Sequence, residues 1–181
     1  MGVDISPDLI GIARERLRRY KLTAELQVCS AYQTHLPSHS VDVVFCMSIL
    51  HHLQLDPVKT EILRVLKPNG LLILKEPVRF SWIMRGARRL FPAKEDSSEF
   101  EYPLSSLDVK SFVEGFEVLA SRSFRSPLIP LLTQVIGISP HHHTIWSIDA
   151  GLLRRIPWLA HFATVRVMAM RVRTSSLPAA A

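Results

Sequence analysis

Side chains that can bind or react lie at the ends of three short apolar runs in the first third of the chain. The runs are Gly2 to Ile5, Glu25 to Cys29, and Val41 to Met47. If they are parallel strands, their carboxyl ends meet at one edge of a sheet, where open α/β sheets bind their ligands. The candidate site residues at or just after these ends are Asp4, Ile5, Ser30, Ala31, Cys46, Met47 and His51.

Asp4 is the first of these candidates. An acid at the end of a strand and just before a helix can accept hydrogen bonds from both hydroxyls of a ribose. Asp4 has this position because Ser6 and Pro7, which follow it, are residues that open a helix. The same position suits an acid that merely caps or solvates the helix start, so by itself it favours neither reading.

His51 offers proton chemistry after the third run. A histidine titrates near neutral pH and can take a proton from an acceptor hydroxyl, which makes His51 a candidate general base. The alternative is that His51 and His52 close the strand end and pack against it.

Three consecutive histidines, His141 to His143, suggest a metal only at first sight. Consecutive side chains point in different directions, and no cysteine or carboxylate lies at ligand spacing from them. We predict no metal site.

The stretch from Val41 to Glu76 predicts the architecture. Val41 to Met47 is typical of a strand buried on both faces, and Asp56-Pro57 predicts a helix start with Asp56 as the N-cap. Lys67 to Gly70 is typical of a turn, and Leu71 to Leu74 of a second short strand. Strand, helix, turn and strand form one βαβ unit, so we expect a parallel sheet and an α/β fold.

The remaining elements follow from periodicity and capping residues. We expect a helix capped by Ser6 with an inward stripe, a helix capped by Ser105 or Ser106 that ends before Gly115, and two late strands. The inward stripe is Leu9, Ile12, Ala13, Arg16, Leu17 and Tyr20, and the late strands are Phe116 to Phe124 and His161 to Arg171.

Four segments, in this order, resemble class I S-adenosylmethionine-dependent methyltransferases of the small-molecule or lipid-modifying type. They are VDISPDLIGIARERL, the loop ending His35-Leu36-Pro37, VDVVFCMSILHHL and LRVLKPNGLLILKEP. The resemblance covers roughly residues 2 to 77. It implies a Rossmann-like sheet, mostly parallel with an antiparallel C-terminal strand pair, and S-adenosyl-L-methionine as the cofactor.

The resemblance also implies roles for the residues at the strand ends. Asp4 would bind the ribose hydroxyls, Ile5 would pack on the adenine, Ser30 and Ala31 would read the adenine edge, and Cys46 and Met47 would lie beside the methionine portion. Ser30 departs from the family, which often has an acid there, and a charge-assisted hydrogen bond to the adenine amine is thereby lost.

A second departure concerns the Gly-rich loop that lets the backbone approach the cofactor in this family. The seven glycines of the chain contain no Gly-x-Gly, and the family places this loop before residue 1. By the family's strand order the missing first strand is central, between the strands that end at Asp4 and Met47. We therefore expect a chain truncated at its N-terminus or a misplaced start.

We expect one methyltransferase-like domain over residues 1–174, with substrate-side insertions at 78–101 and 125–160 and a tail at 175–181. The second insertion is apolar and carries Trp146, Trp158 and Arg154-Arg155. Such a segment suits a cover over a greasy acceptor or a membrane-surface contact, and extra core over one end of the sheet is the alternative.

Charge and composition narrow the classes of partner. A net charge of +6 permits nucleic acid, anionic lipid or anionic small molecules, but no motif of a base-modifying methyltransferase follows Met47, so nucleic acid is not favoured. No signal-peptide pattern or apolar run of about 18 residues occurs, and Cys29 and Cys46 read as reduced core thiols. We predict a cytoplasmic location, with peripheral membrane contact left open.

The sequence therefore predicts S-adenosylmethionine-dependent methyl transfer to a small, apolar or lipid-like acceptor. The alternative is a non-catalytic methyltransferase-like interaction protein or an inactive truncated fragment. The sequence does not identify the acceptor, the atom that is methylated or the oligomeric state.

Overall fold

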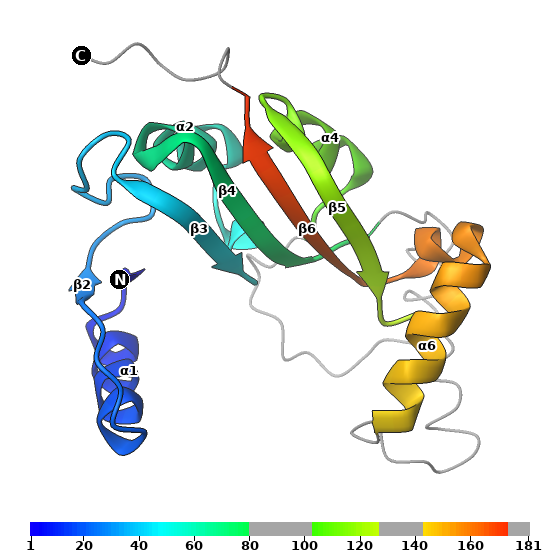
Figure 1. Ribbon diagram of the computed structural model, residues 1–181, viewed down its shortest axis with the longest axis horizontal. Coiled ribbons are helices and arrows are strands. Elements are labelled where there is room, and N and C mark those ends of the chain that lie inside the picture. The colour runs from blue at the N-terminus through cyan, green and yellow to red at the C-terminus, as the bar shows by residue number, and fades with distance from the viewer. Residues whose placement is uncertain (80–102, 127–142, 174–181) are drawn as a thin grey trace.

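The computed structural model describes residues 1–79, 103–126 and 143–173, and its strands form two sheets (Figure 1). The smaller sheet pairs β1 (Gly2–Asp4) with β2 (Leu26–Val28) in parallel, and the larger has the order β3-β4-β6-β5. The strands of the larger sheet are β3 (Val41–Met47), β4 (Leu66–Pro77), β5 (Phe116–Phe124) and β6 (Val165–Val172). The helices are α1 (Pro7–Arg19), α2 (Leu55–Val65), α4 (Ser106–Val113) and α6 (His143–Arg155), with 3-10 turns η1 (Leu50–His52) and η2 (Pro157–Phe162).

The direction of the strands confirms the predicted α/β fold. β3 and β4 are parallel and joined through α2, whereas β6 runs antiparallel to both β4 and β5. The last strand begins at Val165, and not at His161 as predicted, because Pro157 starts a 3-10 turn that reaches Phe162. The Rossmann-like sheet with an antiparallel C-terminal pair is therefore present.

The division into two sheets falls where the family's first strand was expected. β1 pairs with β2, and β3 pairs with β4, but β1 and β3 belong to different sheets. Figure 1 shows the β1-α1-β2 unit set to one side of the larger sheet. Within the described residues, the edges of β1 and β3 that correspond to the central position therefore have no strand partner.

The main core lies between the larger sheet and the helices α2 and α4, which cover the same face of that sheet (Figure 1). Its members are apolar side chains from all of these elements: Val58 and Ile62 from α2, Val109 and Phe112 from α4, and Leu72, Leu74, Phe116, Met168, Met170 and Val172 from the strands. At the start of α4 the Ser105 hydroxyl accepts a hydrogen bond from the Asp108 N–H, and the Asp108 carboxylate accepts one from the Ser105 N–H. This capping box confirms the predicted helix start.

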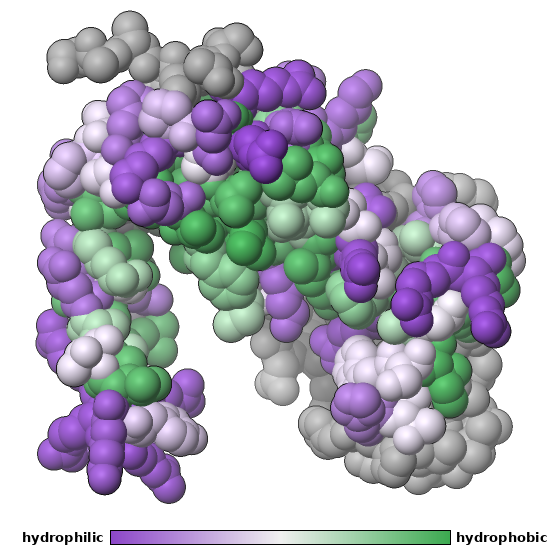
Figure 2. Space-filling model, in the orientation of Figure 1, coloured by the Kyte–Doolittle hydropathy of each residue, from purple (hydrophilic) through white to green (hydrophobic). Residues whose placement is uncertain are grey.

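The opposite face of β3 is open. Val43, Phe45 and Met47 are 46%, 61% and 57% exposed, and Figure 2 shows an apolar area on this side of the larger sheet. The prediction of a strand buried on both faces is therefore wrong for β3, because α2 and α4 cover only its other face. An exposed apolar stripe of this kind is a candidate binding surface.

Two local predictions also need correction. α2 begins at Leu55 after Gln54, so Asp56 lies in the first turn and is not the N-cap. In α1 the Ser6 cap is confirmed, and the predicted inward stripe is confirmed in part: Ala13 and Leu17 are half-buried, but Leu9 and Ile12 are 54% and 51% exposed, and Ile10, which was not predicted, is buried. α1 packs against the two-stranded sheet of β1 and β2, which offers it a narrow surface to cover.

The predicted turn at Lys67 to Gly70 lies inside the bounds of β4 as an irregularity of its register with β3. Asn69 has a positive φ of 63°, which suits a turn residue. A Cβ at Gly70 would come within 2.8 Å of the Lys67 carbonyl oxygen, so this close approach of the backbone requires glycine.

The two faces of the larger sheet predict opposite mutational effects. Leu74→Ala removes a side chain that is 1% exposed, so we expect a loss of about 2–5 kcal/mol in the free energy of unfolding. Phe45→Ala removes a larger side chain that is 61% exposed, so we expect a loss of less than about 1 kcal/mol. Urea unfolding measures both values, and equal losses would contradict the open face.

Candidate functional site

The first part of the site lies at the carboxyl ends of β1 and β2. Asp4 Oδ1 accepts a hydrogen bond from the Ser6 backbone N–H at 2.8 Å, which fixes the carboxylate at the turn into α1. The Asp4 carbonyl accepts from the Cys29 N–H at 3.0 Å, so the strand end that carries Asp4 lies beside the one that leads to Ser30. The structure thus brings these two predicted site residues into one neighbourhood.

The surfaces in this neighbourhood suit an adenosine. Ile5 is 75% exposed and offers an apolar surface that a purine ring could cover. Ser30 Oγ accepts from the Tyr32 N–H at 3.2 Å, which leaves the hydroxyl hydrogen able to donate. Ala31, next in the chain, packs against the main core. These residues fit the nucleoside part of S-adenosylmethionine, although the carboxylate that the family often has at Ser30 is absent.

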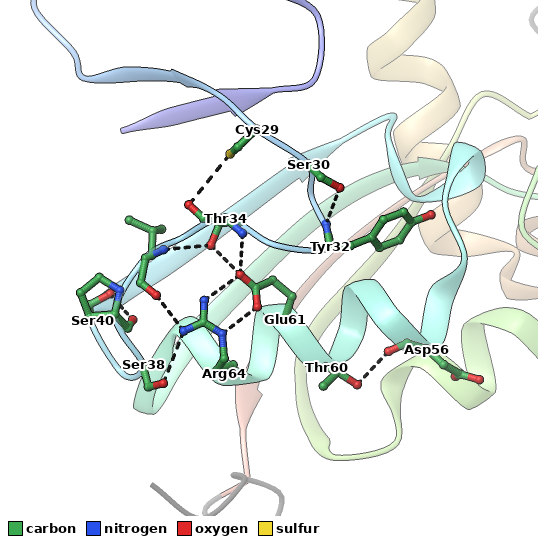
Figure 3. A network of polar contacts seen from close by, with 12 residues as sticks. Cys29, Ser30, Tyr32, Thr34, Ser38, Ser40, Asp56, Thr60, Glu61 and Arg64 are labelled. Carbon is green, nitrogen blue, oxygen red and sulfur yellow. Dashed lines mark hydrogen bonds and ion pairs between the residues drawn. The ribbon is translucent and has the colours of Figure 1, made fainter. Parts of the chain in front are cut away.

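A buried network holds the loop after β2 against α2 (Figure 3). Glu61 Oε1 accepts from both the backbone N–H and the hydroxyl of Thr34, at 2.7 and 2.6 Å. Arg64 donates to both oxygens of Glu61 at 2.7 Å and to the Leu36 carbonyl at 2.7 Å. Tyr32 adds a further bond, its hydroxyl accepting from the Gln54 N–H at 2.9 Å. The loop that carries Ser30 and Ala31 is therefore fastened to the larger sheet through α2.

The second part of the site is centred on Glu76, near the carboxyl end of β4. Its side chain is buried, with 1% of the residue exposed. Oε1 accepts from the backbone N–H groups of Ile49 and Leu50, each at 3.0 Å, and Oε2 lies 2.9 Å from Nδ1 of His51. The rings of His51 and His52 contact each other, with centroids 4.0 Å apart. His51 is thus held by a buried carboxylate and by its neighbour.

Glu76 was not among the predicted site residues. The signal that could have found it is the one used for Asp4, an acid at the end of an apolar strand, here after Leu71 to Leu74. Its partners come from a segment about 25 residues earlier in the chain, which no local pattern indicates.

Cys46 and Met47 end β3 on opposite faces. Burial, together with the nearby Glu76 carboxylate, raises the pKa of the Cys46 thiol to about 11, so this cysteine stays protonated at neutral pH and is not a nucleophile. Met47 points to the open face and is 57% exposed. The chain then turns at Ser48, which has a positive φ of 54° and whose N–H bonds to the Lys75 carbonyl at 2.8 Å.

The predicted site residues therefore form two groups on different sheets. Asp4, Ile5 and Ser30 lie with the smaller sheet, and Cys46, Met47 and His51 with the larger one, beside Glu76. The loop of Ala31 and Tyr32 connects the groups.

The predicted insertions are described only in part. Residues 80–102 and 127–142, with His141 and His142, lie outside the described residues. What is described of the second insertion includes α6, which is tied to the end of β5 because the buried Asp149 accepts from the N–H groups of Arg125 and Ser126 at 2.9 and 3.1 Å. In the described parts of the chain, every helix is too short or too polar to cross a membrane.

Comparison with known proteins shows what parts of the chain are similar to. Residues 1–74 match the sequence profile of the methyltransferase domain family. The chain is 30% identical over 139 residues to an uncharacterized protein of Methanocaldococcus jannaschii, a match that covers 76% of this chain and 55% of that protein. The chain thus spans about half the length of this relative.

Two solved structures share the fold. A SAM-dependent methyltransferase from Methanosarcina mazei has a TM-score of 0.64 at 18% identity, covering 94% of this chain and 80% of that one. Geranyl diphosphate C-methyltransferase from Streptomyces coelicolor, solved with Mg²⁺, geranyl diphosphate and S-adenosyl-L-homocysteine, has a TM-score of 0.62 at 15% identity, covering 95% and 64%. These neighbours confirm the predicted Rossmann-like fold, and the profile match over residues 1–74 shows that the first part of the chain is similar to methyltransferase domains.

The network around Glu61 makes stability depend on pH in a predictable direction. Hydrogen bonds from Arg64, opposed by burial and supported by Thr34, lower the pKa of Glu61 to about 2. In the unfolded chain a glutamate has a pKa of about 4.3. Because the folded pKa is the lower one, the stabilisation is complete above about pH 5 and is lost as the pH falls toward 2.

We therefore expect Glu61→Gln to lower the free energy of unfolding by about 1–3 kcal/mol at pH 7 and by roughly half as much at pH 3, measured by urea unfolding. Glu15→Gln is the matched control, since Glu15 pairs with Arg18 but its side chain is 63% exposed, and we expect it to have little effect at either pH. A difference between Glu61→Gln and the unmodified protein that stayed constant across this pH range would contradict the assignment.

Proposed function

We propose that this protein takes part in S-adenosylmethionine-dependent methyl transfer to a small, apolar or lipid-like acceptor. The observation that carries the proposal is Asp4, an acid fixed at a strand end beside Ser30, in a segment that matches the methyltransferase domain family. S-adenosylmethionine, when bound, supplies an electrophilic methyl group on a sulfonium. The residues of this chain bind, orient and shield the reactants.

On the cofactor side, the roles follow from the atoms that are available. One oxygen of Asp4 is held by Ser6, and the carboxylate has the capacity to accept hydrogen bonds from ribose hydroxyls as well. Ile5 would cover one face of the adenine, and Ser30 with Ala31 would face its edge. Met47, exposed at the end of β3, and Cys46 beside it would border the methionine portion.

On the acceptor side, His51 is the proposed general base. Transfer to a hydroxyl oxygen requires the loss of its proton, and an imidazole is suited to take it near neutral pH. The His51 side chain is 7% exposed, so it is shielded from water, which favours reaction between positioned groups.

The acceptor class is argued from the open face of β3. Val43, Phe45 and Met47 form an apolar stripe that ends at the carboxyl edge, next to the proposed site. One neighbour of the same fold was solved with geranyl diphosphate, whose geranyl part is a hydrocarbon chain. Both observations support an apolar acceptor over a nucleic acid.

A second candidate function is that of a methyltransferase-like protein without catalysis. It is favoured by Ser30 in place of the acid that the family often has. Such a protein would keep the fold and the apolar surface but would not bind the cofactor.

Titration calorimetry with S-adenosylmethionine separates the two. We expect the 181-residue protein to bind, and Asp4→Ala to weaken binding about tenfold or more, because hydrogen bonds to a charged group contribute about 1.5–3 kcal/mol. Asp42→Ala is the control, since Asp42 is an exposed acid at the other end of β3. Labelled methyl groups should then pass to an apolar lipid extract and not to RNA. A folded protein that does not bind would favour the second candidate.

Peripheral contact with an anionic membrane is part of the proposal. Ile148 and Trp158 are 54% and 62% exposed, and α6 ends with the exposed Arg154 and Arg155. We expect flotation with phosphatidylglycerol vesicles, weaker at high salt and reduced by Trp158→Ala. Leu107→Ala, which alters an exposed leucine on α4, should change nothing. Protein that stays entirely unbound would contradict the contact.

A further inference from the structure

Glu76 is the least exposed charged side chain among the described residues. A buried carboxylate is costly unless hydrogen bonds replace the water it has lost. Here two backbone N–H groups and one imidazole nitrogen replace it, all from the segment between β3 and α2. The arrangement therefore joins the end of β4 to the turn η1.

The two oxygens of Glu76 have different partners. Oε1 accepts hydrogen bonds from the N–H groups of Ile49 and Leu50, which lie at the start of η1. These two bonds alone would suffice to cap the turn. Oε2 faces Nδ1 of His51 at 2.9 Å, a contact that capping does not require. The second contact indicates a role toward the histidine.

The chemistry of the pair determines which ring nitrogen carries hydrogen. An ionised carboxylate only accepts hydrogen bonds, so a neutral His51 must place its hydrogen on Nδ1. Nε2 then carries a lone pair, which is the form that can accept a proton. Contact with the His52 ring at 4.0 Å further limits rotation of the His51 ring.

We infer that Glu76 is a positioning residue, which holds His51 in the tautomer with a basic Nε2 and stabilises the imidazolium that forms when Nε2 takes a proton. This inference rests on the proposed function and deepens it. As the acceptor oxygen forms its bond to the methyl carbon, the sulfur–methyl bond breaks and its electron pair stays on sulfur. The hydroxyl proton passes to Nε2 of His51, and the positive charge then lies beside the Glu76 carboxylate.

The test reads the tautomer directly. In protein labelled with ¹⁵N-histidine, long-range proton–nitrogen NMR shows which nitrogen of His51 is protonated, and His51→Gln assigns the signal. We expect hydrogen on Nδ1 in the unmodified protein. In Glu76→Gln, where the amide can still accept from the backbone through its oxygen but must donate toward Nδ1, we expect hydrogen on Nε2.

Activity supplies the second readout. We expect Glu76→Gln to lower kcat for methyl transfer to the lipid extract by about 100-fold, with the affinity for S-adenosylmethionine unchanged. Glu61→Gln is the control for a buried glutamate, here on α2, that does not face His51, and it should leave the His51 tautomer as it is.

The outcomes separate the inference from the proposed function. Hydrogen on Nε2 in the unmodified protein overturns the inference even if S-adenosylmethionine binds, and this holds whether or not Glu76→Gln folds. A tautomer that remains on Nδ1 in folded Glu76→Gln overturns it as well. The expected tautomers in a protein that does not bind S-adenosylmethionine uphold the positioning of His51 by Glu76 and overturn the proposed function.

Discussion

The structure depends on one buried carboxylate, that of Glu61, because it connects the two sheets. The β1-α1-β2 unit shares no strand pairing with the larger sheet in the described part of the chain. Its connection runs through the loop after β2, where Thr34 donates twice to Glu61 and Arg64 holds both Glu61 and the Leu36 carbonyl. Together with the Tyr32–Gln54 hydrogen bond and the packing of Ala31 on the main core, this network sets the position of the residues beside Asp4 relative to those beside His51.

A second buried carboxylate, that of Glu76, fixes a loop in the same way beside the other group of site residues. Both glutamates are buried, and each accepts a hydrogen bond from at least one backbone N–H of a loop that follows a strand: Thr34 for Glu61, and Ile49 and Leu50 for Glu76. Because an unpaired buried charge is so unfavourable, each loop has one arrangement that satisfies its carboxylate. The candidate site thus owes its geometry to two acids that need not touch a ligand themselves.

The open face of β3 lies next to the loops that these two glutamates hold. α2 and α4 cover one side of the larger sheet, while Phe45 and Met47 remain exposed on the other, close to the carboxyl edge. The family match covers residues 1–74, which include both groups of site residues except Glu76. Fold likeness alone does not specify an acceptor, so the chemistry of these side chains carries the functional argument.

The sequence by itself determined whatever depends on neighbouring residues: the βαβ unit, the cap at Ser6, a helix start at Ser105 or Ser106, the strand Phe116 to Phe124, and the strand ends that carry Asp4 and His51. Only the tertiary structure decided which surfaces meet. The exposure of Phe45 and the burial of Ile10 in place of Leu9 follow from which elements pack together, and Glu61 and Glu76 meet partners 27 and 25 residues away in the chain. The sequence shows whether a side chain is apolar or charged, and periodicity shows which residues share a face. The free energy of burying a side chain depends on the groups that the fold packs against it.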